Sequence, residues 1–325
     1  MTTSNSTPQQ NAPPLPDPRL ILDYIEAFRR SKVMFTAVEL GLFERQPETD
    51  TERRLADSCV ALGLLERDGE TYRNTPAADT YLRRDSPETM TGYIDYSNRV
   101  LFRLWQDLGG AVREGTHRWQ STGTLFSNFY ASDDAMRTFV MGMHGFGRIA
   151  SPSVAAAFDL SAFTRMVDLG GATGHLAMAV HERWPQISAA ILDLPRVIEF
   201  ARTVATDVDF IAGDFFADPL PPADLYALGR ILHDWSEDKI RVLLAKIHES
   251  LPPGGALLIA EILLDGDRIP AHMQSLNMLI CTEGRERTLE QYRALLEEAG
   301  FAAVEAVVTG KPVDAILARK GKAVK

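Results

Sequence analysis

The sequence predicts an α/β protein in which a mostly parallel sheet of seven strands follows a mainly helical N-terminal region. Beyond Ser151, short apolar runs alternate with stretches of helical periodicity, an order that favours parallel strands with helices on both faces of the sheet. A glycine-rich turn, VDLGGATGHLA at residues 167–177, lies between the first of these strands and the next helix. Before Ser151, apolar residues recur mainly at helical spacing.

The N-terminal region is predicted to hold several helices and one small hairpin. The first stretch shows the pattern of two helices with a break near Ser31, and Gly63 ends the next one. An Asp-Gly turn at Asp68 and Gly69 joins two short alternating runs into a hairpin. Helix, helix, hairpin is the outline of a winged-helix unit. The helical stretches cover residues 19–45 (two helices), 54–65, 76–82 and 89–112.

The C-terminal region alternates strand and helix until its last two strands. A Gly-Lys-Pro turn joins these two, so we expect an antiparallel hairpin at the edge of the sheet. Strands are predicted at residues 165–169, 189–192, 208–211, 225–228, 256–261, 303–308 and 314–318. Helices are predicted at residues 175–184, 195–206, 236–250 and 289–299.

Composition and charge narrow the classes of protein to which this chain can belong. The net charge of −10 argues against a nucleic-acid-binding surface, and no run approaches the ~20 apolar residues of a membrane span. Residues 1–18 lack the basic and apolar segments of a secretory signal and are predicted to be a disordered tail. With Cys59 and Cys281 as the only cysteines, we expect a reducing, cytoplasmic location. A helical domain at 19–150 and a ligand-binding domain at 151–325 are expected.

Acidic residues and glycines at consecutive strand ends predict a cofactor site. The glycines of Asp168-Leu-Gly170-Gly171-Ala-Thr-Gly174 allow a ligand to approach the backbone closely. Asp193 ends the next strand, where a carboxylate can accept ribose hydroxyls, and Asp214-Phe215 follows the third strand, where it can meet adenine. Because the turn is not G-x-G-x-x-G, a dinucleotide is disfavoured, and a ribose ligand with a charged amino-acid tail fits better. The alternatives are a simple tight turn and, for Asp193, a helix N-cap.

A histidine and a glutamate at strand ends predict acid–base chemistry at the same edge of the sheet. His233 follows the fourth strand, beside Asp234, and Glu261 ends the fifth. An imidazole titrates near neutral pH and can remove a proton from a hydroxyl. The carboxylate of Glu261 would then hold the imidazole in one tautomer. For Glu286, in the polar segment CTEGRERT, the residues alone favour an ordinary ion pair on a polar loop.

Together these motifs resemble the S-adenosylmethionine-dependent small-molecule O-methyltransferases of the caffeic-acid and hydroxyindole type. Within that group they are most similar to the acetylserotonin O-methyltransferase-like proteins. The resemblance spans residues 24–318 and rests on the segments ELGLF, GLLE, REGTH, AGDFF, DPLP, GRILHDW, MQSLNML, TEGRERT and VDAILA. It implies a Rossmann-like methyltransferase domain after a winged-helix-like dimerisation domain, and hence a homodimer in which each subunit lends residues to its partner's site.

The resemblance also implies roles for particular residues. For the cofactor S-adenosylmethionine these are Asp168, Gly170, Gly171, Gly174, Asp193, Leu194, Asp214, Phe215 and Arg230. For catalysis it implies His233 as the general base, flanked by Glu261 and Glu286, with Asp234 beside it. For the substrate it implies a pocket lined by Tyr96, Phe139, Met143, Phe146, Asn277, Met278 and Cys281. Core packing is the alternative for any one of the pocket residues.

Two features depart from the family pattern. Ala172 stands where the family usually has a third glycine, a change that we expect to be tolerated if φ is negative there. The segment at residues 46–54 is shorter than in relatives by about one helix, which predicts a truncated winged-helix unit.

The sequence thus predicts methyl transfer from S-adenosylmethionine to a hydroxyl of an aromatic small molecule, such as a phenol or hydroxyindole. We expect no metal, because there is no His/Cys cluster to hold one. The alternatives are N- or C-methylation or another use of the same cofactor by a relative. A non-catalytic regulator that binds the cofactor or DNA is a third hypothesis, which the acidic charge disfavours.

Overall fold

A computed structural model describes residues 15–119, 129–205 and 208–321, and it confirms the predicted α/β architecture. The seven-stranded sheet has the order β5-β4-β3-β6-β7-β9-β8. Strands β3 to β7 are parallel, and β9 is antiparallel to both of its neighbours, as the predicted edge hairpin requires. The strands are β3 (Arg165–Leu169), β4 (Ser188–Asp193), β5 (Asp209–Ala212), β6 (Leu225–Gly229), β7 (Ala256–Glu261), β8 (Phe301–Val307) and β9 (Asp314–Lys320).

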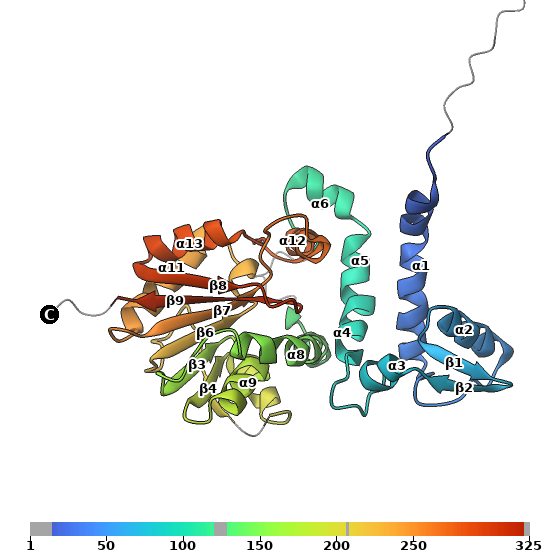
Figure 1. Ribbon diagram of the computed structural model, residues 1–325, viewed down its shortest axis with the longest axis horizontal. Coiled ribbons are helices and arrows are strands. Elements are labelled where there is room, and N and C mark those ends of the chain that lie inside the picture. Colours follow the sequence, from blue (N-terminus) through green and yellow to red (C-terminus); the bar gives the residue numbers. More distant parts are fainter. Residues whose placement is uncertain (1–14, 120–128, 206–207, 322–325) are drawn as a thin grey trace, which may run out of the picture.

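Helices cover both faces of this sheet (Figure 1). Successive strand residues point to opposite faces: Val167 packs under α11 and α13, whereas Met166 packs under α8 and α9. Helix α8 is continuous across position 150, so one helix joins the two predicted domains. The helices of this region are α8 (Asp133–Ala155), α9 (His175–Arg183), α10 (Pro195–Ala201), α11 (Glu237–Ser250), α12 (Ile269–Cys281) and α13 (Leu289–Glu298).

Two helices here differ from the sequence prediction. Helix α12, which packs against α5 and α6, was not predicted, because its mostly apolar sequence lacks a long polar stripe. Helix α10 ends at Ala201, before the predicted end at position 206, which lies outside the described residues.

The N-terminal region forms a separate lobe at the other end of the molecule (Figure 1). Its helix α1 is continuous, so the predicted break near Ser31 was wrong: no Pro or Gly interrupts it, and the Ser31 hydroxyl donates to the Ala27 carbonyl within the helix. Helix α2 begins earlier than predicted, with Thr49 and Glu52 forming a capping box. The hairpin is confirmed. The elements are α1 (Arg19–Glu39), α2 (Asp50–Ala61), β1 (Leu65–Asp68), β2 (Thr71–Asn74) and α3 (Pro76–Tyr81).

A column of short helices connects this lobe to the sheet (Figure 1). The single helix predicted at residues 89–112 is interrupted by a π-helical turn at Ser97–Leu101, and again where Asp107 caps a new helix. Such π turns often occur at functional sites. The segments are α4 (Thr91–Tyr96), α5 (Phe102–Trp105) and α6 (Leu108–Glu114). Of the predicted tail at 1–18, residues 1–14 lie outside the described residues. Among the described helices, none has the length and apolar character that crossing a membrane requires.

Candidate active site

A cavity of about 510 Å³ opens at the carboxyl edge of the parallel strands. Strands β3, β4, β6 and β7 end at one side of it, and helices α4, α8 and α12 form the opposite wall. Ligands of open α/β sheets bind at this edge, so the cavity lies where the fold predicts a site.

The glycine-rich turn after β3 forms the floor of the cavity. Gly170 has φ +73°, and a Cβ there would lie 2.6 Å from Ile231 Cδ1. Glycine at this position therefore keeps the floor of the cavity open to a ligand. Gly171 and Gly174 pack against side chains behind the turn and do not line the cavity. Ala172 has φ +48°, so the negative φ that would make alanine easy to tolerate here is not present. The turn holds Ala172 there because its amide donates to Asp193 Oδ2 at 2.9 Å.

Of the three predicted cofactor carboxylates, two border the cavity and one lies behind the glycine-rich turn. Asp193 borders the cavity, and its Oδ1 accepts the Leu194 amide at 2.7 Å; helix α10 begins after Leu194, so Asp193 is not its N-cap. Asp168 lies behind the turn, where burial and the nearby Asp193 carboxylate raise its pKa to about 7. Asp214 and Phe215 border the cavity beyond β5, and Asp214 Oδ1 accepts the Phe216 amide at 2.8 Å.

Arg230 borders the cavity with a strained backbone. It follows β6 with φ +58°, an uncommon conformation for a residue with a side chain. Its guanidinium lies 4.4 Å from the centre of the Phe146 ring and 3.7 Å from Met143 Sδ. Among the described residues it has no carboxylate within ion-pair distance, which leaves its charge available to a ligand.

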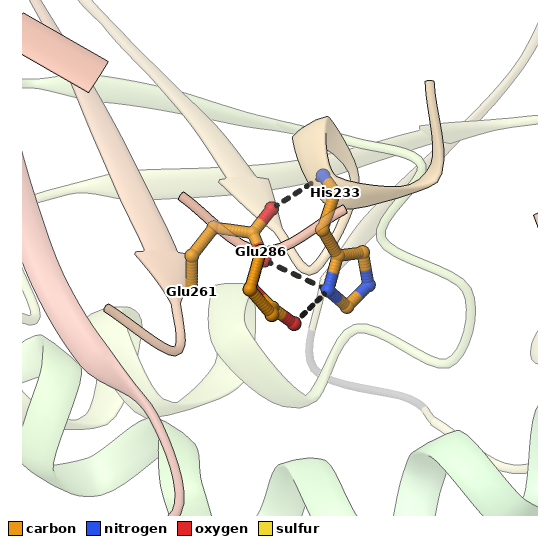
Figure 2. Close-up of side chains that lie close together, drawn as sticks. All are labelled: His233, Glu261 and Glu286. Carbon is orange, nitrogen blue, oxygen red and sulfur yellow. Dashed lines mark hydrogen bonds and ion pairs between the residues drawn. The ribbon is translucent and has the colours of Figure 1, made fainter. Parts of the chain in front are cut away.

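His233 lies at the centre of the predicted catalytic cluster (Figure 2). Its Nδ1 is 2.6 Å from Glu286 Oε1 and 3.2 Å from Glu261 Oε2, while its backbone amide donates to Glu261 Oε1 at 3.2 Å. All three side chains are almost fully buried. Because Nδ1 faces the two carboxyl groups, Nε2 is the nitrogen left for a ligand in the cavity that His233 borders.

Burial changes the proton affinity of the surrounding acids. It raises the pKa of Glu286 to about 8 and that of Glu261 to about 7. Asp234 also borders the cavity, and burial raises its pKa to about 6. Its Oδ1 is 3.7 Å from His233 Nε2, too far for a hydrogen bond. The pair of glutamates can therefore share a proton with the imidazole near neutral pH, while Asp234 stands beside the free nitrogen.

The loop that carries Glu286 is fastened to the turn that carries His233. A Cβ on Gly284 would clash with the carbonyl oxygen of His233 and lie 2.8 Å from the carbonyl carbon of Asp234. Arg287 is 1% exposed, and its guanidinium donates to the carbonyls of Leu232 and Trp235 at 3.3 and 3.4 Å. Sequence reasoning missed both residues, although the second arginine of GRER was a visible signal.

The helical wall supplies an apolar, aromatic lining. All seven predicted substrate residues border the cavity: Tyr96, Phe139, Met143, Phe146, Asn277, Met278 and Cys281. Phe139 packs edge-on to Tyr96 and stacks on Phe129, with ring centres 5.5 and 4.4 Å apart. Asn277 is fixed by Trp105, whose Nε1 donates to it at 2.9 Å. The lining residues Tyr93, Phe129, Tyr130 and Trp235 were missed; the aromatic richness of the 89–112 stretch pointed to Tyr93 alone.

The His233, Glu261 and Glu286 ligand atoms lie within 4.8 Å of one another, which makes them a possible metal set. However, the 2.6 Å between His233 Nδ1 and Glu286 Oε1 is shorter than the separation of about 3.3 Å between ligands of a tetrahedral zinc. The arrangement fits a hydrogen-bonded proton-sharing group better than a metal centre.

Known proteins are similar to this chain in sequence and fold. Residues 105–302 match the O-methyltransferase domain family. The acetylserotonin O-methyltransferase of Gallus gallus is 39% identical, over 93% of this chain and 97% of that protein. A human probable bifunctional dTTP/UTP pyrophosphatase/methyltransferase protein is also 39% identical, over 94% of this chain, which spans only 54% of it.

A solved structure of human N-acetylserotonin methyltransferase in complex with S-adenosylmethionine superposes with a TM-score of 0.89 at 37% identity. The match covers 98% of this chain and 100% of that one. The chain therefore belongs to the family of S-adenosylmethionine-dependent O-methyltransferases.

Proposed function

We propose that this enzyme methylates a hydroxyl group of an aromatic small molecule and that His233 is its general base. The observation that carries the proposal is the imidazole itself, held at Nδ1 by Glu286 and placed at the wall of an aromatic cavity. An aromatic hydroxyl with a pKa of ~10 is a poor methyl acceptor until its proton leaves. A positioned base contributes about 10²–10⁴ in rate to such a step.

The cavity fits the cofactor at several points. S-adenosylmethionine supplies, when bound, an electrophilic methyl group on a sulfonium. We place its ribose at Asp193 and its adenine at Asp214 and Phe215, because these residues border the cavity at the ends of neighbouring strands. Gly170 leaves the floor open for close approach, and Leu194 and Arg230 border the same space. Asp168, Gly171 and Gly174 would act from behind, by shaping the turn.

Proton transfer then follows from the hydrogen bonds. In the reactive form Glu286 is a carboxylate and accepts the Nδ1 proton of His233, so Nε2 is free to take the proton of the acceptor hydroxyl. The deprotonated acceptor oxygen would then be the nucleophile for the methyl group that the bound cofactor would supply. Glu261 and Glu286 stabilise the resulting imidazolium, and Asp234 can hold a second polar group of the acceptor near Nε2.

The acceptor is expected to be flat and mostly apolar. Phe139, Phe146 and Met143 offer ring faces and a polarisable sulfur, and Asn277 offers an amide held in place by Trp105. Met278 and Cys281 complete the apolar wall. N- and C-methylation remain outcomes that the product assay distinguishes.

The proposed partner is a second copy of this chain. Helix α1 exposes a run of large apolar side chains, Leu20, Ile21, Leu22, Tyr24, Ile25 and Phe28, each 53–67% exposed. An apolar surface of this kind typically marks an interface. We therefore propose that residues 19–150 form a winged-helix-like dimerisation domain, that residues 151–325 form the catalytic domain, and that the protein works in the cytoplasm.

The test is a methyl-transfer assay on a panel of phenols and hydroxyindoles, with products identified by mass and by NMR. His233→Gln is expected to lower kcat at least about 100-fold while S-adenosylhomocysteine still binds with wild-type affinity. Full turnover in this variant would overturn the general-base assignment. Methyl groups found only on nitrogen or carbon would overturn the proposed acceptor.

A further inference from the structure

A polar pair borders the cavity where α8 meets the start of α9. Ser151 Oγ in α8 is 2.9 Å from Nδ1 of His175, the first residue of α9, and both side chains border the cavity. Because Nδ1 is occupied by Ser151, Nε2 is the ring nitrogen left to meet a ligand. The proposed mechanism uses neither residue.

Helix packing holds this imidazole in place. A Cβ on Gly147 of α8 would clash with the His175 ring, so glycine lets α8 lie directly against it. Beside it, His144 Nδ1 is 2.8 Å from Thr173 Oγ1, which ties α8 to the turn before α9. Burial, with His144 and Arg230 nearby, lowers the pKa of His175 to about 3. The ring is therefore neutral at physiological pH and carries one proton.

The strand order indicates which part of the cofactor reaches this pair. The four strands lie side by side in the order β5-β4-β3-β6. With adenine beyond β5 and ribose at the end of β4, the remaining amino-acid tail must extend over β3 and towards β6. The pair meets it there, since His175 follows the turn after β3 and Gly229 at the end of β6 borders the same cavity.

We infer that Ser151 and His175 form a subsite for the α-amino-acid tail of the cofactor. The Ser151 hydroxyl donates to Nδ1, which places the ring proton on Nε2, and Nε2–H donates to the tail carboxylate. Arg230, which has no carboxylate within ion-pair distance among the described residues, adds positive charge at the same end. This inference rests on the proposed positions of adenine and ribose.

Two ligands separate the tail from the rest of the cofactor. S-adenosylhomocysteine carries the amino-acid tail, and 5′-methylthioadenosine is the same nucleoside thioether without it. Calorimetric titration of the full chain is expected to show that His175→Ala weakens S-adenosylhomocysteine binding about tenfold or more, as the loss of a hydrogen bond to a charged group implies. Binding of 5′-methylthioadenosine is expected to change less than about twofold.

Further variants guard against a simple folding defect. His175→Gln, whose side-chain amide can still donate, is expected to recover part of the lost affinity. Ser151→Ala keeps the imidazole ring but removes the hydroxyl that fixes its tautomer. We expect the affinity for S-adenosylhomocysteine, but not for 5′-methylthioadenosine, to fall about threefold. Equal losses for the two ligands, or no loss, would overturn the subsite, as would a wild-type chain that binds both equally well. Absent phenol methylation would overturn only the proposed reaction.

Discussion

The two sides of the active-site cavity are built differently. The sheet side places charged groups at the ends of β3, β4, β6 and β7, where backbone ladders hold them in register. The helical side, from α4, α8 and α12, offers mainly aromatic rings and methionines that are held by packing. Rigid polar groups suit a donor and a chemistry shared by a whole family, whereas a packed apolar wall can be reshaped for different acceptors.

The loop that carries Gly284 follows α12 on the helical side and packs against the His233 turn on the sheet side, and disturbing it is expected to have the largest effect. Gly284→Ala adds a Cβ that clashes with the His233 carbonyl and so moves the base. We expect kcat to fall about 100-fold or more, with S-adenosylhomocysteine affinity within about twofold of wild type. Gly109→Ala is the matched control, since its nearest side-chain atom would lie 3.6 Å away, at Arg113. A Gly284→Ala enzyme with normal kcat would show that the loop does not position His233.

A smaller effect, on the free energy of unfolding, is expected from Glu286 of the buried glutamate pair, and this effect depends on pH. The folded pKa of Glu286, about 8, lies above the ordinary value of 4.5, so the folded state binds the extra proton between these pH values. Its contribution to stability is present below about pH 4.5 and is lost as the pH rises through about 8. Glu286→Gln should remove that loss, so the free energy of unfolding should fall less between about pH 5 and pH 8.

Urea denaturation at the two pH values measures this difference. Between these pH values, we expect the free energy of unfolding to fall by at least about 1.4 kcal/mol less in Glu286→Gln than in the wild type, the equivalent of one pKa unit. Glu298→Gln, which removes an exposed carboxylate paired with Arg241, serves as the control and should leave the pH dependence unchanged. The same pH dependence in Glu286→Gln as in the wild type would show that Glu286 is not the group responsible.

The smallest effect is expected on the helical side. Phe139→Leu removes a ring that stacks on Phe129 and borders the cavity. Loss of an aromatic contact is worth about 0.5–1.5 kcal/mol, so the acceptor KM should rise about two- to tenfold. The affinity for S-adenosylhomocysteine should not change, and Phe158→Leu, in the core beneath α8, controls for general packing. Equal weakening of donor and acceptor would contradict a division of labour between the two sides.

Much of the sheet side could be predicted from sequence. Strand β3 has its predicted bounds, and the acids of β4 and β7 lie where alternation of strand and helix places them. His233, Glu261 and Glu286 were expected together and are found within hydrogen-bond reach. Parallel strands make this possible, because all of their carboxyl ends reach one edge and a short apolar run marks each of them.

Other features of the site depend on contacts that no local pattern encodes. The positive φ of Ala172 follows from a hydrogen bond to Asp193, 21 positions away. The role of Arg287 in holding the Glu286 loop follows only from the hydrogen bond that its guanidinium donates to the Leu232 carbonyl. Helix α12 escaped prediction because its side chains are mostly apolar, so the sequence lacks the long polar stripe that reveals a surface helix.

By itself, then, the sequence determined which functional groups stand at which strand ends, and it determined the cofactor class and the family. Each of these depends on residue types at strand ends and on their spacing. Only the tertiary structure decided which nitrogen of His233 is held, that the Glu286 loop rests on Gly284, and that Ser151 meets His175. These are contacts between distant segments, and their geometry is set by how helices pack on the sheet rather than by any periodicity along the chain.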